Sequence, residues 1–189
     1  MALLRGINVG GNRAVAMADL RDVVREAGHT EVATHLRTGN VVLVAREGSE
    51  TGLATQITAG LRARLGIDVE VMVRTTAELD AVIAANPFPD AARDDPAHLV
   101  VMFYAAPVQV DPGFDAARYG REQVVWAGAH GYLHYRDGIG RSRLTPAVLA
   151  RATGQAGTGR NWRTVLALRE LAADRDLAAA RALAGADDA

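Results

Sequence analysis

The chain has 189 residues, 49% of them hydrophobic and 23% charged, with a formal net charge of −1. This balance is typical of a globular protein, and it excludes extended disorder and a basic surface of the kind that binds nucleic acid over its whole extent. The chain has no cysteine and no lysine, so all 21 basic residues are arginines. Disulfides, thiolate metal sites and lysine Schiff bases are therefore excluded.

The sequence also shows no targeting signal and no membrane-spanning segment. No apolar run approaches the roughly 20 residues that span a bilayer. The first residues, Met-Ala-Leu-Leu-Arg, show no basic stretch followed by an apolar core of the signal-peptide type. We therefore expect a cytoplasmic protein with no membrane partner.

The first 75 residues predict the order strand, helix, strand, strand, helix, strand. Helices are expected over 17–27 and 49–65, where apolar residues recur at three- and four-residue spacing. Short apolar or alternating stretches predict the strands, at 2–7, 32–37, 41–44 and 69–73. This order is that of the split βαβ unit of ferredoxin-like folds.

The rest of the chain partly repeats this pattern. A capping box at Thr75–Glu78 begins a helix that ends before Asn86, and 87–97, rich in proline and aspartate, is the predicted linker. The second half is then expected to contain a strand (98–105), a hairpin (123–135), a helix from Pro146 to Gly154, a helix from 158 to about 173 and a last alanine-rich helix, with no final strand. We predict an α+β fold of two tandem ferredoxin-like (α-β plait) subdomains, 1–86 and 97–189, the second irregular, with C-terminal helices.

Three segments rich in arginine, asparagine and glycine lie at the ends of these elements. In the first, 5–11, glycines between a strand and a helix let backbone amides turn toward an anion. The second, 37–40, is a hairpin turn. The third, 158–164, places two arginines at a helix start, which disfavours cations unless an anion is bound. Each segment also has a plainer interpretation: a tight turn, a simple hairpin, and a helix start with a buried tryptophan.

Other catalytic or metal-binding patterns are weak. His130 and His134 are four residues apart across a bend, with no third ligand in view, so no metal is predicted. Ser49 and Ser142 are the chain's two serines, and neither lies in a G-x-S-x-G motif. We therefore name no catalytic residue and no cofactor, and the sequence leaves open whether the protein is an enzyme.

The three segments, in this order, carry a resemblance. Leu3–Gly11, Thr38–Val42 and Arg160–Trp162 with Thr164-Val165 resemble the bacterial family called domain of unknown function 1697. The resemblance runs from Ala2 to roughly Leu171 and implies two tandem α-β plaits, without an established activity. The chain departs from the family pattern at Thr38 (usually Ser), Leu43 (usually aromatic) and Ala167 (usually Lys). Family members also begin a few residues earlier, so we expect an upstream start.

Three hypotheses for function follow. In the first, the chain binds a phosphate-bearing ligand, either a nucleotide or a single-stranded nucleic acid. Its site would be one rim formed by Arg5, Asn8, Gly10, Gly11, Arg37, Asn40, Arg160, Asn161 and Arg163, with Trp162 nearby. In the second, these side chains only hold the two halves together by hydrogen bonds. In the third, the chain is an enzyme acting on a small phosphorylated or carboxylated substrate. The sequence indicates no oligomeric state.

Overall fold

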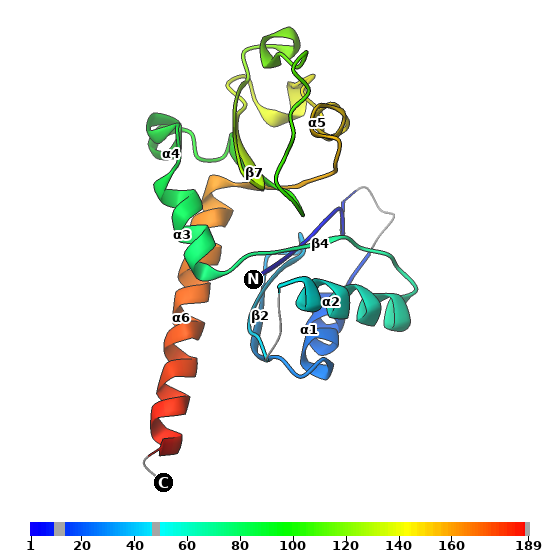
Figure 1. The fold of residues 1–189 in the computed structure, drawn as a ribbon, viewed down its shortest axis with the longest axis vertical. Coiled ribbons are helices and arrows are strands. Elements are labelled where there is room, and N and C mark those ends of the chain that lie inside the picture. The colour runs from blue at the N-terminus through cyan, green and yellow to red at the C-terminus, as the bar shows by residue number, and fades with distance from the viewer. Residues whose placement is uncertain (10–13, 47–49, 188–189) are drawn as a thin grey trace. The chain divides into compact units, whose positions relative to one another are not determined.

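The computed structural model describes residues 1–9, 14–46 and 50–187 (Figure 1). Within these residues the strands form two four-stranded antiparallel sheets, which confirms the predicted α+β class. The chain divides into two compact units, residues 1–80 with 167–189, and residues 81–166. This division differs from the predicted one, 1–86 and 97–189, in assigning the end of the last helix to the first unit.

The first unit contains every element predicted for residues 1–75. In chain order these are β1 (Ala2–Leu4), α1 (Met17–Glu26), β2 (Thr30–His35), β3 (Asn40–Val44), α2 (Glu50–Leu65) and β4 (Val71–Val73). The sheet has the order β2-β3-β1-β4, with each neighbouring pair antiparallel. Each helix therefore connects two strands that have another strand between them in the sheet.

The helices α1 and α2 cover one face of this sheet (Figure 1). Apolar residues of α1 (Leu20, Val23) and α2 (Ile57, Leu61) pack against alternate strand residues such as Val41. The spacing of these residues, three and four apart in the helices and two apart in the strands, is what puts them on a common face.

The second unit repeats this strand order. Two helices, α3 (Thr76–Ala84) and α4 (Pro89–Asp94), lead into β5 (Leu99–Phe103), η1 (Ala116–Tyr119), β6 (Gln123–Ala127), β7 (His130–His134), η2 (Ile139–Arg141), α5 (Pro146–Thr153), β8 (Thr158–Asn161) and α6 (Trp162–Asp187). The sheet order is β6-β7-β5-β8. A short 3-10 helix, η1, stands where the first unit has α1. The boundaries between the two units fall inside α3 and α6.

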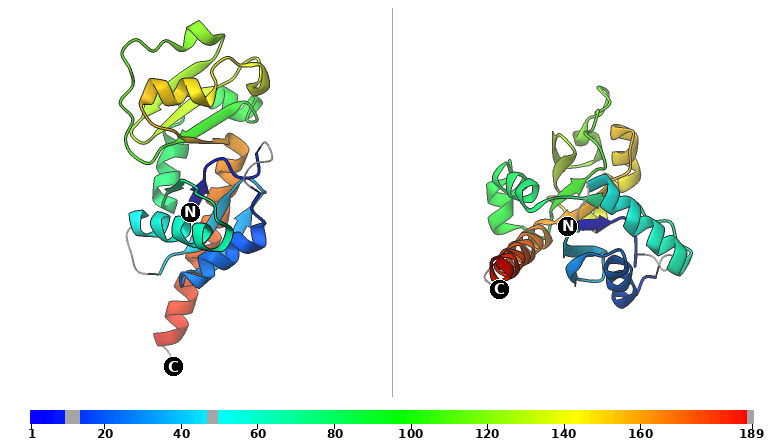
Figure 2. Two further views of the ribbon diagram at one scale, coloured as in Figure 1. Left: turned by 90° about the vertical axis from the view of Figure 1, so that its right-hand side faces the viewer. Right: turned by 60° about the horizontal axis from the view of Figure 1, so that its bottom comes forward.

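The core of the second unit lies between its sheet and α5, which crosses one sheet face (left view of Figure 2). Val100 and Met102 of β5 contact this helix side, where Val148 and Leu149 are buried. The opposite sheet face is buried as well, and on it the Tyr132 hydroxyl donates to the Val82 carbonyl of α3 at 2.7 Å.

Three sequence predictions for the second half differ from the structure. Residues 158–161, predicted to begin a helix, form the strand β8, which pairs with β5 from Phe103↔Thr158 to Val100↔Asn161. The segment Thr-Gly-Arg-Asn shows no apolar alternation and contains a strand-disfavouring glycine, so its pairing is imposed by the sheet. The predicted linker 87–97 contains the helix α4, with Pro89 at its start. The two predicted C-terminal helices form one continuous helix, α6.

Candidate functional site

The side chain of Asn8 joins the first two predicted segments. Its Nδ2 donates to the carbonyl of Val15 at 2.9 Å and to the carbonyl of Arg37 at 2.7 Å. Its Oδ1 accepts from the Val15 backbone N–H at 2.9 Å. Asn8 itself has φ +55, a left-handed conformation that asparagine tolerates better than most residues. One side chain therefore closes the loop between β1 and α1 and fixes it to the β2–β3 turn.

This closure places the start of α1 beside Arg37. The helix begins at Met17, two residues after the clasped Val15, and no side chain of the described residues caps its first N–H groups. Uncapped N–H groups at a helix start carry partial positive charge. Gly10 and Gly11, predicted as part of the site, lie in the same loop but outside the described residues. The described part of this end, which we call the clasp, consists of Asn8, Val15 and Arg37.

Arg37 of the clasp and the arginines Arg21 and Arg5 of neighbouring segments differ in whether a carboxylate neutralises their charge. Arg37 is exposed, and Arg21 of α1 donates to Thr34 Oγ1 of β2 at 2.9 Å. Neither of them forms an ion pair with a carboxylate of the described residues. Arg5, in contrast, pairs with Glu70 at 2.7 Å, both side chains being about two-fifths exposed. Among the residues that the structure describes, Arg21 and Arg37 thus have no neutralising carboxylate.

Asn40, another predicted site residue, is fully buried. Its Nδ2 donates to the carbonyl of His35 at 2.9 Å and to Thr38 Oγ1 at 3.2 Å, across the β2–β3 turn. Gly39 of the same turn has φ +79, and a Cβ there would lie 2.8 Å from the Leu4 Cβ. The structure therefore brings segments 5–9 and 37–40 together, and within them Asn40 holds the turn.

The third predicted segment begins α6 in the second unit. Asn161 Oδ1 accepts from the Thr164 backbone N–H and from Thr164 Oγ1, both at 2.9 Å, so Asn161 caps the helix. Trp162 is buried in the core, whereas Arg163 is exposed. The asparagine and the tryptophan of this segment thus have clear structural roles.

Arg160 is nine-tenths buried on β8. Its Nη1 donates to Thr158 Oγ1 at 2.6 Å and to the Gly159 carbonyl at 2.8 Å. Burial lowers the pKa of the Arg160 guanidinium to about 10, because desolvation disfavours the charged form. That pKa is still well above neutrality, so Arg160 is a cation held inside the folded protein at pH 7.

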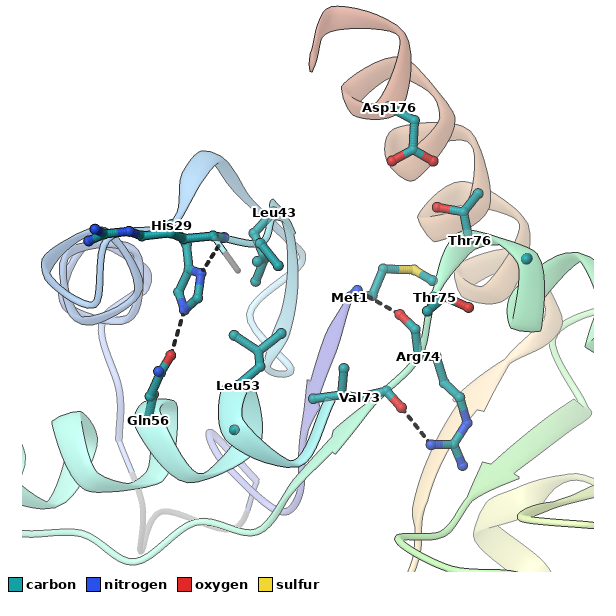
Figure 3. A pocket seen from close by; sticks show the side chains of 14 residues that line it. Met1, His29, Leu43, Leu53, Gln56, Val73, Arg74, Thr75, Thr76 and Asp176 are labelled. Carbon is teal, nitrogen blue, oxygen red and sulfur yellow. Dashed lines mark hydrogen bonds between the residues drawn. The ribbon is translucent and has the colours of Figure 1, made fainter. Parts of the chain in front are cut away.

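The first unit also contains a cavity of about 400 Å³ that none of the predicted site residues lines. Figure 3 shows His29, Leu43 and Gln56 on one side and Thr76 and Asp176 on the other. Its walls combine apolar side chains from β3, α2 and β4 with threonines at the start of α3. This size is at the lower end of what small-molecule sites occupy.

His29, which lines this cavity, belongs to none of the motifs found in the sequence. Its Nδ1 accepts from the Arg46 backbone N–H at 3.2 Å, which places the ring hydrogen on Nε2, facing Gln56 Oε1 at 3.0 Å. Both ring nitrogens are thus engaged. His29 thus ties the segment after α1 to the segment after β3 and to α2.

The described residues contain neither a metal-binding cluster nor a membrane-spanning helix. No group of three or more His, Asp or Glu side chains there is arranged to hold a metal ion. No helix among these residues combines the length and the apolar character that crossing a membrane requires.

The sheets and the clasp define the class of protein: an α+β chain of two units, each with a four-stranded antiparallel sheet of the same strand order. The chain belongs to the family described as Protein of unknown function (DUF1697), whose model matches residues 1–132. Its structure is similar to that of a conserved bacterial protein, SP0830, from Streptococcus pneumoniae, with a TM-score of 0.66 and 18% sequence identity over 90% of this chain and 96% of that chain. This likeness shows a shared fold. No curated protein matches the chain in sequence.

Proposed function

We propose that the first unit binds a small phosphate-bearing ligand at the clasp. The observation that carries this proposal is the position of Asn8 Nδ2, which donates both to the carbonyl of Val15, two residues before α1 begins, and to the carbonyl of Arg37. Among the described residues, no side chain caps this helix start and no carboxylate pairs with the exposed Arg37, and the Asn8 bonds hold the two close together. Both favour an oxyanion, the helix through its N–H groups and the arginine through its planar fork of donors.

The proposal is narrower than the single rim that the sequence predicted. Asn8 and Asn40 use their side-chain atoms to hold backbone, and Asn161 uses its carbonyl oxygen to cap α6. For these residues, and for the buried Trp162, we propose a structural role inside one unit, whereas the structural alternative from the sequence had them hold the two halves together. Arg37 and Arg21 remain as side chains that can reach a ligand of the first unit.

We also propose that each unit is a ferredoxin-like α-β plait. The strand orders β2-β3-β1-β4 and β6-β7-β5-β8 support this, since both match the split βαβ arrangement. In such a plait the connection from the first strand to the first helix lies at one end of the sheet, which is where the clasp lies in the first unit.

The experiment is a calorimetric titration of the full chain with inorganic pyrophosphate at low and at moderate salt. We expect binding that weakens with salt, because the contacts are ionic. Replacing Arg37→Ala should weaken it by about tenfold, equivalent to about 1.4 kcal/mol, since a hydrogen bond to a charged group is lost.

Arg121→Ala is the matched control. Arg121 is also exposed, and its removal changes the net charge equally, but it belongs to the second unit and pairs with Asp137 at 3.3 Å. We expect the affinity of the Arg121→Ala variant for pyrophosphate to equal that of the unaltered chain. Equal affinities in the Arg37→Ala and Arg121→Ala variants would show that no anion site exists at the clasp.

A further inference from the structure

The strand β6 is an outer strand of the second sheet, and β7 is its neighbour on one side. Its five residues, Gln-Val-Val-Trp-Ala, include no charged residue and no proline. Its register with β7 runs without a shift from Gln123↔His134 to Ala127↔His130, so no bulge interrupts it. Among the described residues, no loop or helix forms a backbone hydrogen bond to residues 123–127. The free side of β6 is therefore open to a further strand, because charges, prolines, bulges and covering segments are the usual obstacles to such pairing.

One outer strand of the first sheet, β2, is protected in two ways. Its register with β3 shifts between Thr30 and Ala33, and Arg175 Nε of α6 donates to the Glu31 carbonyl at 3.1 Å. A register shift and a side chain bound to the backbone both hinder pairing with another strand. The chain therefore protects β2 by means that β6 lacks.

The side chains of β6 alternate between the two faces of its sheet. Val124 and Trp126 pack against the core on the α5 side, so Val125 between them points to the opposite face. Val125 is 40% exposed. Single exposed valines are ordinary on a protein surface. This one, however, lies at the midpoint of an unprotected outer strand, where a further strand would cover it.

We infer that β6 pairs with β6 of a second copy of this chain, antiparallel and about a two-fold axis at Val125. The strand is complementary to itself in this register, because Val125 then faces Val125 of the second copy and no charges are opposed within residues 123–127. Val124 faces Trp126 of the second copy, and pairs of a β-branched with an aromatic residue are favourable across strands. Two copies thereby form one continuous sheet.

The strength of this dimer follows from its size. Five residues on each side bury much less than the roughly 800 Å² that each partner contributes to a standard interface. A small interface gives a weak complex, so we expect a dissociation constant on the order of 0.1 mM. The dimer must therefore be sought at high protein concentration.

Sedimentation equilibrium of the full chain from about 0.01 to about 1 mM tests the inference. The weight-average mass of the unaltered chain should rise with concentration from 20.0 kDa toward twice that value. Val125→Arg and Val125→Glu each place two like charges opposite one another at the axis, so each should raise the dissociation constant by about tenfold or more. An equimolar mixture of these two variants opposes unlike charges instead, and it should associate about as strongly as the unaltered chain.

Leu177→Arg is the matched control, because Leu177 is an aliphatic residue of α6, 52% exposed, and its replacement adds the same charge outside β6. This variant should associate like the unaltered chain. An unaltered chain that stays monomeric at the highest concentration would overturn the inference, as would equal association of Val125→Arg and Leu177→Arg. A mixture of Val125→Arg and Val125→Glu that stays monomeric would overturn it as well. Recovery of the dimer in the mixture shows that the single variants are folded, since misfolded chains would not restore a defined dimer.

Discussion

Asn8 shows how one residue can serve both fold and site. Its three hydrogen bonds join Val15 and Arg37, which are 22 positions apart in the chain, and no local pattern in the sequence indicates that pairing. The sequence did indicate that segments 5–11 and 37–40 matter together, because each combines turn residues with arginine at the end of an element. It could not indicate which side chains would form hydrogen bonds to the backbone, because those bonds depend on how the loop closes in three dimensions.

Replacing Asn8→Ala should reduce the free energy of unfolding by about 3 kcal/mol, because three hydrogen bonds are lost and alanine is strained at φ +55. Asn8→Gly loses the same bonds without the strain, so it should be less destabilising by about 1 kcal/mol. Urea unfolding followed by circular dichroism measures both. Equal losses in the two variants would contradict the assigned strain, and no loss in either would contradict the clasp.

The hydrophobic pattern of the sequence predicted those helices and strands that have a periodicity of their own. The helices α1 and α2 and the strand β3 are amphipathic or continuously apolar, so the sequence alone locates them. The capping box that begins α3 is confirmed, with Thr75 N to Glu78 Oε2 at 2.8 Å and Glu78 N to Thr75 Oγ1 at 3.1 Å. The strand β8 was missed because its four residues become a strand through pairing with β5, which a local pattern does not encode.

The close approach of α1 and α2 depends on Gly60. A Cβ at this position would lie 2.5 Å from Val23 Cγ1, which is closer than two non-bonded carbon atoms can approach. In a free helix alanine is favoured over glycine by about 1 kcal/mol, so helix propensity alone predicts that Gly60→Ala stabilises the protein. We expect the opposite, a loss of about 1–2 kcal/mol, because the helices must separate or Val23 must leave its rotamer.

Urea unfolding of a double-mutant cycle checks this expectation. Val23→Ala removes the atoms that Gly60→Ala would strike, so the double variant should be more stable than the sum of the two single effects predicts. Simple additivity would show that the helices do not meet at this pair of residues.

For the whole molecule, the sequence predicted two halves of similar element order, and the repeated strand order agrees with that prediction. The end of α6 was harder to assign. Its alanine-rich sequence shows where a helix forms but carries no sign of which unit it packs with. The structure assigns residues 167–189 to the first unit, where Arg169 Nε donates to Asp80 Oδ1 at 2.6 Å and Arg175 Nε donates to the Glu31 carbonyl at 3.1 Å.

The Arg175 contact has a particular consequence for β2, an edge strand of the first sheet. Glu31 lies where the β2–β3 register shifts between Thr30 and Ala33, and its carbonyl accepts from Arg175. Bulges of this kind protect an edge strand from pairing with another chain, but they leave backbone groups in need of partners. Arg175 supplies one, and α6 thereby stabilises the edge of a sheet that is more than 100 residues earlier in the chain.

Truncation of the chain after Leu166 should therefore loosen the first unit more than the second. It removes the buried Leu168 and Ala172 together with Arg169 and Arg175. We expect amide hydrogen exchange to accelerate over β2 and the start of α3, while β5 and β7 keep their protection, because local stability follows local packing. Truncation after Ala180 is the control, since it retains all four of these residues and should exchange like the full chain. Faster exchange confined to the second unit would instead support the division that the sequence predicted, with α6 as part of the second half.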